Sequence, residues 1–523
     1  MSKASTLPER KKAAMYAKVD IWQNRVAGLL VMLVLCLQPL FLSGNRYLIL
    51  TRDKFMLFVV YMLPILAAVA IIWIVRVARK PRLGPRERPY LADWAVLGFA
   101  LVTLLSALFS PFKSDTNVWV GIYERYDGVV TQLLYIAVFL IVAKWYRPRL
   151  RHFILFGISA TLVALIGILQ FFGIDIFDLW GNAQDIMPVQ NFYNISFRTT
   201  LGNVNIVSTY VCAAIMLSSL LYVKMRTKWK YLWLAAGALN FWLMELAGAD
   251  SGRVGTVVAM ILAVPFFVEN LKVLGRTLIM GSTWIAAYAL HKLFYEVMVL
   301  HSRTFYSLLP YIAAAAALLA AGLVLAIRGK ETAGRDSPVR WKLGLLLVAA
   351  CIAAGLAGAE ILGKRDAEAG RASTIYEMRE IVHGNISDEF GSRRIYIWRN
   401  ALEVYPQHPL IGTGPDTFGR IFPEEAQMKY GERYTKAHNE YIQILICQGI
   451  LGFLCYMLFI GATLAKSVPK AFRNPLVAAA MAAFIAYCAQ SFFNIGVPIV
   501  SQFLWLFAGI LANKNVREKG LEQ

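Results

Sequence analysis

The chain has 523 residues, of which 58% are hydrophobic and only 16% are charged. A soluble domain usually carries about 25% charged residues, so this composition excludes a single large soluble core. The formal net charge is +21, but the basic residues lie in short gaps between apolar runs. That distribution is typical of a polytopic membrane protein and not of a nucleic-acid-binding fold. We therefore expect membrane lipids, and no nucleic acid, as partners.

The apolar residues fall into runs of roughly 18–24 residues, the length that an α-helix needs to cross about 30 Å of hydrocarbon. The sequence therefore predicts an all-α, polytopic transmembrane helix bundle with about 12–14 spans. The eighth and last runs are short and the ninth is only weakly apolar, so these three are the weakest candidates. In chain order the fourteen candidate spans are roughly 26–43, 55–75, 93–110, 128–143, 153–172, 204–223, 231–247, 254–268, 277–292, 304–327, 343–361, 441–465, 476–494 and 500–512.

The basic residues of the short connecting segments indicate how the bundle is oriented. With the N-terminus in the cytoplasm, 33 of the 53 Lys and Arg residues fall on the cytoplasmic side. This is the bias that the positive-inside rule describes, so both termini are predicted to be cytoplasmic. The predicted cytoplasmic segments are 1–25, 76–92, 144–151, 224–230, 269–276, 328–342, 466–473 and 513–523.

One predicted outside segment, 362–440, is polar and long enough to fold. Apolar residues at helical spacing from Trp398 to Tyr405 predict an amphipathic helix, which Pro406 ends. The spacing of apolar residues within 375–382 predicts a second, shorter amphipathic helix. We expect both helices to lie at the membrane surface or to cap a cavity.

Four basic residues gather at the predicted outer boundary of the membrane, where the positive-inside rule disfavours them. Arg198 precedes the sixth span, Arg253 lies between the seventh and eighth, and Arg394 and His438 lie in the large loop. Arginine suits a phosphate clamp because its planar guanidinium donates two hydrogen bonds at once. Histidine exchanges protons near neutral pH. Any one of these arginines alone is more often an interfacial anchor, and a lone histidine is more often a cap, but their combination on one side favours a site.

Two other charged residues have structural explanations in the sequence. Arg125 lies beside Glu124 and Asp127, either of which is a suitable ion-pair partner. Glu245, near the end of the seventh span, is either structural or an intramembrane functional acid.

Several short motifs follow one another in a recognisable order. The large loop contains Ser392-Arg393-Arg394-Ile395-Tyr396-Ile397-Trp398, then His408-Pro409-Leu410-Ile411-Gly412-Thr413-Gly414, and His438-Asn439-Glu440-Tyr441-Ile442 leads into Gln448-Gly449-Ile450-Leu451-Gly452. Over about 200–460 this order resembles the O-antigen ligase and O-antigen polymerase superfamily, which includes bacterial protein O-oligosaccharyltransferases. Upstream, Arg198-Thr199-Thr200-Leu201-Gly202-Asn203-Val204-Asn205 looks like the family's Arg-Gly-Asn-Asn segment, and Ser251-Gly252-Arg253 matches as well.

One position departs from the family pattern. Many members have Gly before the functional arginine of the loop, where this chain has Arg393. Either Arg393 or Arg394 is therefore a candidate for that role, and Arg394 is favoured because it keeps the spacing to Trp398.

The resemblance implies a C-type glycosyltransferase-like enzyme of the bacterial cytoplasmic membrane, with its site facing outward. Its donor would be an undecaprenyl-diphosphate-linked glycan, and it would need no metal, nucleotide sugar or other cofactor. Arg198, Arg253 and Arg394 or Arg393 would bind the diphosphate, and His438 would accept a proton from the acceptor hydroxyl. The residues expected to support them are Asn203, Asn205, Asn439, Gly412 and Gly414.

The resemblance also suggests a division of the chain and leaves two questions open. The expected regions are an N-terminal bundle over 1–195, a catalytic region over 196–466 and C-terminal helices with a tail over 467–523. A transporter or flippase is the alternative, but the sequence shows no matched halves with broken helices and few acids within spans. The acceptor, whether a glycan, a lipid or a protein, is not indicated by any motif.

Overall fold

A computed structural model of the chain describes residues 7–78, 89–123, 125–181, 197–298, 305–329 and 338–513. Parts of the predicted cytoplasmic segments 1–25, 76–92, 328–342 and 513–523 lie outside the described residues. In the described part, regular structure is helical apart from one antiparallel pair of two-residue strands, β1 (Phe197–Arg198) and β2 (Gly202–Asn203). The predicted all-α polytopic fold is therefore confirmed.

The helices follow one another with short connections, except in the large loop. The first group comprises α1 (Leu7–Met32), η1 (Leu33–Leu37), α2 (Gln38–Leu40), α3 (Leu50–Ala78), α4 (Leu91–Leu108), α5 (Thr116–Val120), α6 (Val129–Trp145), α7 (Leu150–Phe171), α8 (Val204–Lys224), α9 (Lys230–Ala247) and α10 (Asp250–Phe267). The second comprises α11 (Leu271–Met298), η4 (Phe305–Leu308), α12 (Leu309–Arg328), α13 (Pro338–Glu368), α14 (Thr374–Val382), α15 (Phe390–Val404), η5 (Tyr405–Gln407), α16 (Phe418–Ile421), α17 (Glu424–Met428), α18 (Glu440–Ala471), α19 (Pro475–Ser491) and α20 (Gln502–Ala512).

Every one of the fourteen candidate spans coincides with a helix. Within the described residues, ten helices are long and apolar enough to cross a membrane, and three shorter apolar helices, α6, α19 and α20, match further candidates. The remaining candidate corresponds to α9. The two amphipathic helices predicted in the large loop are also present, as α14 and α15.

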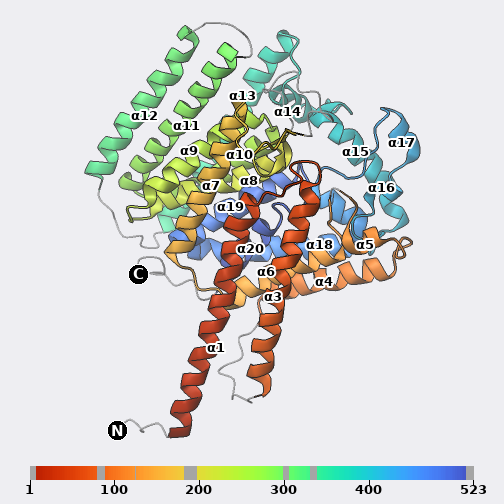
Figure 1. Cartoon of the computed structure of the whole chain (residues 1–523). Coiled ribbons are helices and arrows are strands. Elements are labelled where there is room, and N and C mark those ends of the chain that lie inside the picture. The colour runs from red at the N-terminus through yellow and green to blue at the C-terminus, as the bar shows by residue number, and fades with distance from the viewer. Residues whose placement is uncertain are drawn as a thin grey trace.

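The interior of the bundle is built around α8. Nearly every residue of α8 is buried, and α19 packs along it while α20 packs against α6. Small residues allow this close packing: a side chain at Gly252 of α10 would come within 2.8 Å of the Ser208 Cβ of α8. By contrast, α12 and α13 are almost entirely exposed to their surroundings. In Figure 1, α11 and α12 form a pair on one side of the molecule, and α15, α16 and α17 gather on another.

The large loop is anchored to the bundle through a break in α18. Gly449 interrupts α18 with φ +66°, and this break leaves backbone N–H groups without their helical acceptors. Ile450 N donates to the Pro409 carbonyl at 2.8 Å, and Leu451 N donates to the Leu410 carbonyl at 3.1 Å. The loop segment 409–417 therefore fills the break, which fixes the loop against the part of α18 that follows His438.

Candidate active site

His438 lies immediately before α18 in a constrained backbone conformation. Its φ is +51°, a left-handed value that is uncommon for a residue with a Cβ. On its C-terminal side, the Asn439 side chain caps α18 by accepting hydrogen bonds from Tyr441 N at 2.9 Å and Ile442 N at 3.1 Å. On its N-terminal side, Ala437 N donates to Gln443 Oε1 at 3.0 Å. Both neighbours of His438 are thus tied to the first turn of α18, which holds the strained residue in place.

The surroundings of His438 keep its imidazole neutral. Burial lowers the pKa of His438 to about 3, and the positive charges of Lys436, Arg394 and Arg125 act in the same direction. In the absence of a bound anion, both ring nitrogens are therefore available as one donor and one acceptor at neutral pH.

Arg394 and Arg393 lie beside each other in the chain but serve different neighbours. The regular helical part of α15 begins at Arg394, because Gly391, Ser392 and Arg393 all have left-handed backbone angles. Arg394 donates to the Gly391 carbonyl at 2.9 Å, and its Nε has no protein acceptor among the described residues. Burial lowers the pKa of Arg394, while the charges of Asp250 and Glu377 raise it.

Arg393 points toward the loop region instead. Its guanidinium pairs with Glu432 at 2.9 Å and lies over the ring of Tyr430 at 4.5 Å from its centroid. Arg394 is thus the one of the two that acts electrostatically on His438.

Arg253 stands in the first turn of α10 at the edge of a groove. It lies inside the helix, where the sequence led us to expect it between two spans. It pairs with Glu245 of α9 at 3.0 Å and with Asp250 at 2.8 Å, yet its side chain is still 37% exposed. The groove has a volume of about 590 Å³ and runs between α9, α10 and α11. Apart from Glu245, Arg253, Thr256, Tyr288 and His291, its lining is apolar: Phe241, Met244, Val257, Met260, Ile261 and Trp284.

Asp250 joins the groove to the large loop. One of its carboxylate oxygens pairs with Arg253, and the other accepts a hydrogen bond from Thr374 Oγ1 of the loop at 2.6 Å. The charge of Asp250 also acts on Arg394. The structure therefore brings Arg253, Arg394 and His438 into one electrostatic neighbourhood, although they come from three separate elements.

Arg198 occupies a different environment. It is 1% exposed, its guanidinium lies over the ring of Phe171 at 5.6 Å, and burial lowers its pKa to about 10. The charged group that acts on it is the Tyr47 phenol. Its grouping with the other two arginines stays a prediction.

The predicted supporting residues have clear local roles. Asn203 caps α8 by accepting a hydrogen bond from Asn205 N at 2.9 Å, and the Asn205 carbonyl accepts one from Asn494 Nδ2 at 2.8 Å. Gly412 and Gly414 both have positive φ, and a side chain at Gly412 would meet the Cys447 carbonyl group at 2.4–2.5 Å. Both glycines therefore allow the loop to seat against α18.

The sequence missed the role of Arg125. We expected Glu124 or Asp127 as its partner, but its Nε lies 3.0 Å from Asp416 Oδ1, in an ion pair that is buried on both sides. Asp416 belongs to the loop segment that fills the break in α18, and it also accepts a hydrogen bond from Ile122 N at 2.8 Å. The 291 positions between Arg125 and Asp416 hide this contact from any local reading.

Comparison with known families places the large loop. A family model described as O-antigen ligase matches residues 297–457. That segment belongs to the O-antigen ligase family. Among curated proteins, no sequence matches the chain. The O-antigen ligase segment contains Arg393, Arg394 and His438, whereas Arg198 and Arg253 lie before it. The resemblance stated above is therefore confirmed, and over a shorter stretch than the 200–460 that the motifs suggested.

Proposed function

We propose that the protein transfers a glycan from undecaprenyl diphosphate to an acceptor hydroxyl at the outer face of a bacterial cytoplasmic membrane. The observation that carries this proposal is a neutral histidine held among cations inside an O-antigen ligase segment, beside an apolar groove with an arginine at its edge. The coarser statement, a membrane protein of the glycan ligase and polymerase type, follows from the family match and the helices.

The groove and the arginines suit the two parts of such a donor. Phe241, Met260 and Trp284 offer an apolar surface to a polyprenyl chain. Arg253 and Arg394 each have an Nε atom without a protein acceptor among the described residues. These N–H groups are therefore free to donate to diphosphate oxygens, and guanidinium binds such oxygens with paired hydrogen bonds.

The transfer step balances with these groups. The acceptor oxygen attacks the anomeric carbon as the bond from that carbon to the diphosphate oxygen breaks, and attack from the opposite face inverts the configuration. His438 takes the proton of the acceptor hydroxyl. The arginines stabilise the negative charge that develops on the departing diphosphate. A bound diphosphate also raises the pKa of His438, because its negative charges oppose those of the surrounding cations.

A reconstituted assay tests the proposal against transport. The purified protein is placed in vesicles with an undecaprenyl-diphosphate-linked glycan and candidate acceptors, with and without EDTA. We expect the donor to be converted to free undecaprenyl diphosphate at the same rate under both conditions. Passage of intact donor across the bilayer without conversion would support a flippase, and full loss of conversion in EDTA with rescue by Mg²⁺ would contradict the metal-independent step.

A further inference from the structure

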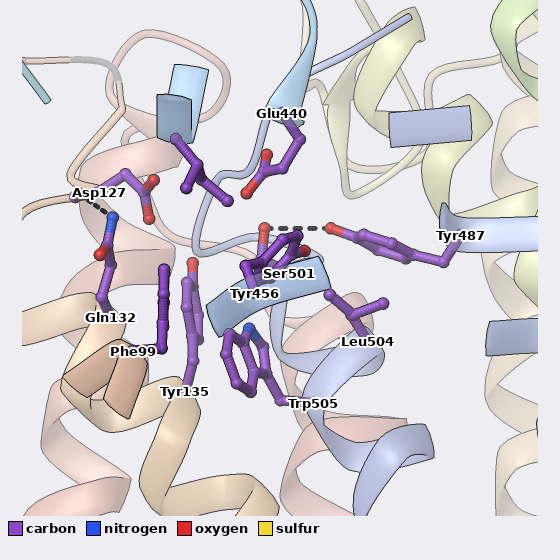
Figure 2. Close-up of a pocket in the computed structure, with 11 residues that line it drawn as sticks. Phe99, Asp127, Gln132, Tyr135, Glu440, Tyr456, Tyr487, Ser501, Leu504 and Trp505 are labelled. Carbon is purple, nitrogen blue, oxygen red and sulfur yellow. Dashed lines mark hydrogen bonds between the residues drawn. The ribbon is translucent and has the colours of Figure 1, made fainter. Parts of the chain in front are cut away.

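A second polar centre lies close to His438, around a small cavity. The cavity has a volume of about 20 Å³, and it is lined by residues of α4, α6, α18, α19 and α20 together with Asp127. Figure 2 shows the carboxyl groups of Asp127 and Glu440 entering it from different sides, with the oxygens of Tyr135 and Ser501 facing the same space. A cavity of this size with several polar partners can hold one water molecule.

The hydrogen bonds of these oxygens leave room for such a water. Ser501 Oγ accepts hydrogen bonds from Val497 N at 2.8 Å and from the Tyr487 hydroxyl at 3.1 Å, so its own hydrogen is left to donate. The Tyr135 hydroxyl is 3% exposed as a residue and has no hydrogen-bond partner among the described residues. One Glu440 oxygen accepts from Gly496 N, which fixes its carboxyl group at the cavity.

The charges around the cavity do not balance if both acids are ionised. Arg125 is the cation that acts on Asp127 and on Glu440, but its guanidinium is already paired with Asp416. Burial raises the pKa of Asp127 well above its ordinary value, and the negative charge of Glu440 raises it further. Two close carboxylates in a buried site cannot both be charged at low cost.

We propose that Asp127 and Glu440 hold one proton between them, through a water molecule in this cavity. The protonated carboxyl donates to the water, the other carboxylate accepts from it, and Ser501 and Tyr135 supply its remaining contacts. The pair then carries one negative charge in place of two. None of the roles assigned above to His438 or the arginines includes this site.

The shared proton has a consequence for the neighbouring site, and this consequence rests on the proposed function. Glu440 is two residues from His438, and Arg125 acts electrostatically on both. With one proton held, the four groups Arg125, Asp416, Asp127 and Glu440 have a net charge of about −1, where full ionisation would give about −2 by formal charge. The proton therefore preserves more of the positive potential that attracts a diphosphate.

Infrared spectroscopy of the purified protein tests the proton directly, without any donor or acceptor. We expect the carbonyl stretch of a protonated carboxylic acid at neutral pH. It should disappear in Asp127→Asn and also in Glu440→Gln, because removing one acid lets the other ionise beside Arg125. Glu425→Gln, at an exposed acid of α17, is the matched control and should leave the band unchanged.

Other results would overturn the shared proton. No acid band in the wild type, or a band that survives in both variants, contradicts it. If the band is absent and the unfolding temperature of the wild type rises with NaCl but not with choline chloride, the cavity binds sodium instead. Should either variant fail to fold, titration of the wild type to alkaline pH gives a second reading, since the band must vanish as the pair ionises. A protein without transferase activity but with the band would disprove the proposed function and leave the shared proton standing.

Discussion

At His438, both the backbone and the side chain are held in uncommon states. A left-handed φ on a residue with a Cβ costs free energy on the order of 1–3 kcal/mol, and the capping contacts of Asn439 and Ala437 maintain it. The imidazole is kept neutral among positive charges. Strain and a lowered pKa at one residue are typical of functional positions.

The pH dependence of transfer should differ between the free enzyme and the donor complex. In the free enzyme the pKa of His438 is lowered to about 3, so kcat/KM should not fall as pH decreases through 6.5, the ordinary value for His. A bound diphosphate raises this pKa, so kcat should lose activity at a higher pH than kcat/KM does. Steady-state rates across acidic pH check both statements. A fall of kcat/KM centred near pH 6.5 that is absent from His438→Gln would show that free His438 titrates normally.

The two adjacent arginines of the large loop offer a matched comparison. Arg394→Lys keeps the charge but loses the planar fork and the unpaired Nε–H, so we expect donor use to fall roughly 10- to 100-fold, the worth of one charge-assisted hydrogen bond of about 1.5–3 kcal/mol. Arg393→Lys should stay within about threefold of wild type, because Arg393 serves Glu432 and Tyr430. Donor turnover by the two variants is the measurement. Equal losses, or a larger loss in Arg393→Lys, would reverse the assignment.

At the scale of elements, the broken helix α18 connects the bundle to the large loop. Its break at Gly449 receives the carbonyl groups of Pro409 and Leu410, while the Cys447 carbonyl accepts hydrogen bonds from Gly414 N and from Ser106 Oγ, both at 2.8 Å. The same stretch of loop carries Asp416, the partner of Arg125. The position of His438 therefore depends on contacts made one to two turns further along α18.

Gly449→Ala should destabilise the protein more than a helix substitution normally does. A Cβ at this position would come within 2.3 Å of the Leu410 carbonyl group, and the left-handed φ adds about 1–3 kcal/mol. We expect a clearly lower unfolding temperature in detergent. Gly461→Ala, on the same helix with nothing within 4 Å, is the control and should leave the unfolding temperature equal or slightly higher. Equal melting of both variants would mean that the break is not structurally required.

The sequence predicted helices much better than it predicted contacts. Each apolar run became a helix because hydrocarbon length and backbone hydrogen bonding leave few other solutions. Local spacing also located α14 and the helical part of α15. The break at Gly449, the pairing of Arg125 with Asp416 and the meeting of Asp250 with Thr374 depend on long-range packing, which no local pattern encodes. The separate environment of Arg198 was likewise hidden, because motif order places residues along the chain and not in space.

At the scale of the whole molecule, the proposed function requires the large loop to face outward. The positive-inside bias predicts this orientation, and cysteine accessibility tests it. In a variant without the six native cysteines, Gln407→Cys in the large loop should react with an impermeant thiol reagent in intact cells. Lys228→Cys, exposed between α8 and α9, should react only after the cells are opened. The reverse pattern would place the candidate site in the cytoplasm.

Glycan transfer by purified wild-type protein and by His438→Gln is the most direct measurement of what the protein does. With an undecaprenyl-diphosphate-linked glycan and a competent acceptor, the wild type should release undecaprenyl diphosphate and glycosylated acceptor in equal amounts. Glutamine keeps hydrogen-bonding capacity but is not a useful base, so transfer by His438→Gln should fall on the order of 10²–10⁴-fold while its affinity for the donor changes little. Near-normal transfer by His438→Gln, or a wild type that binds the donor and leaves it unchanged with every class of acceptor, would contradict this mechanism.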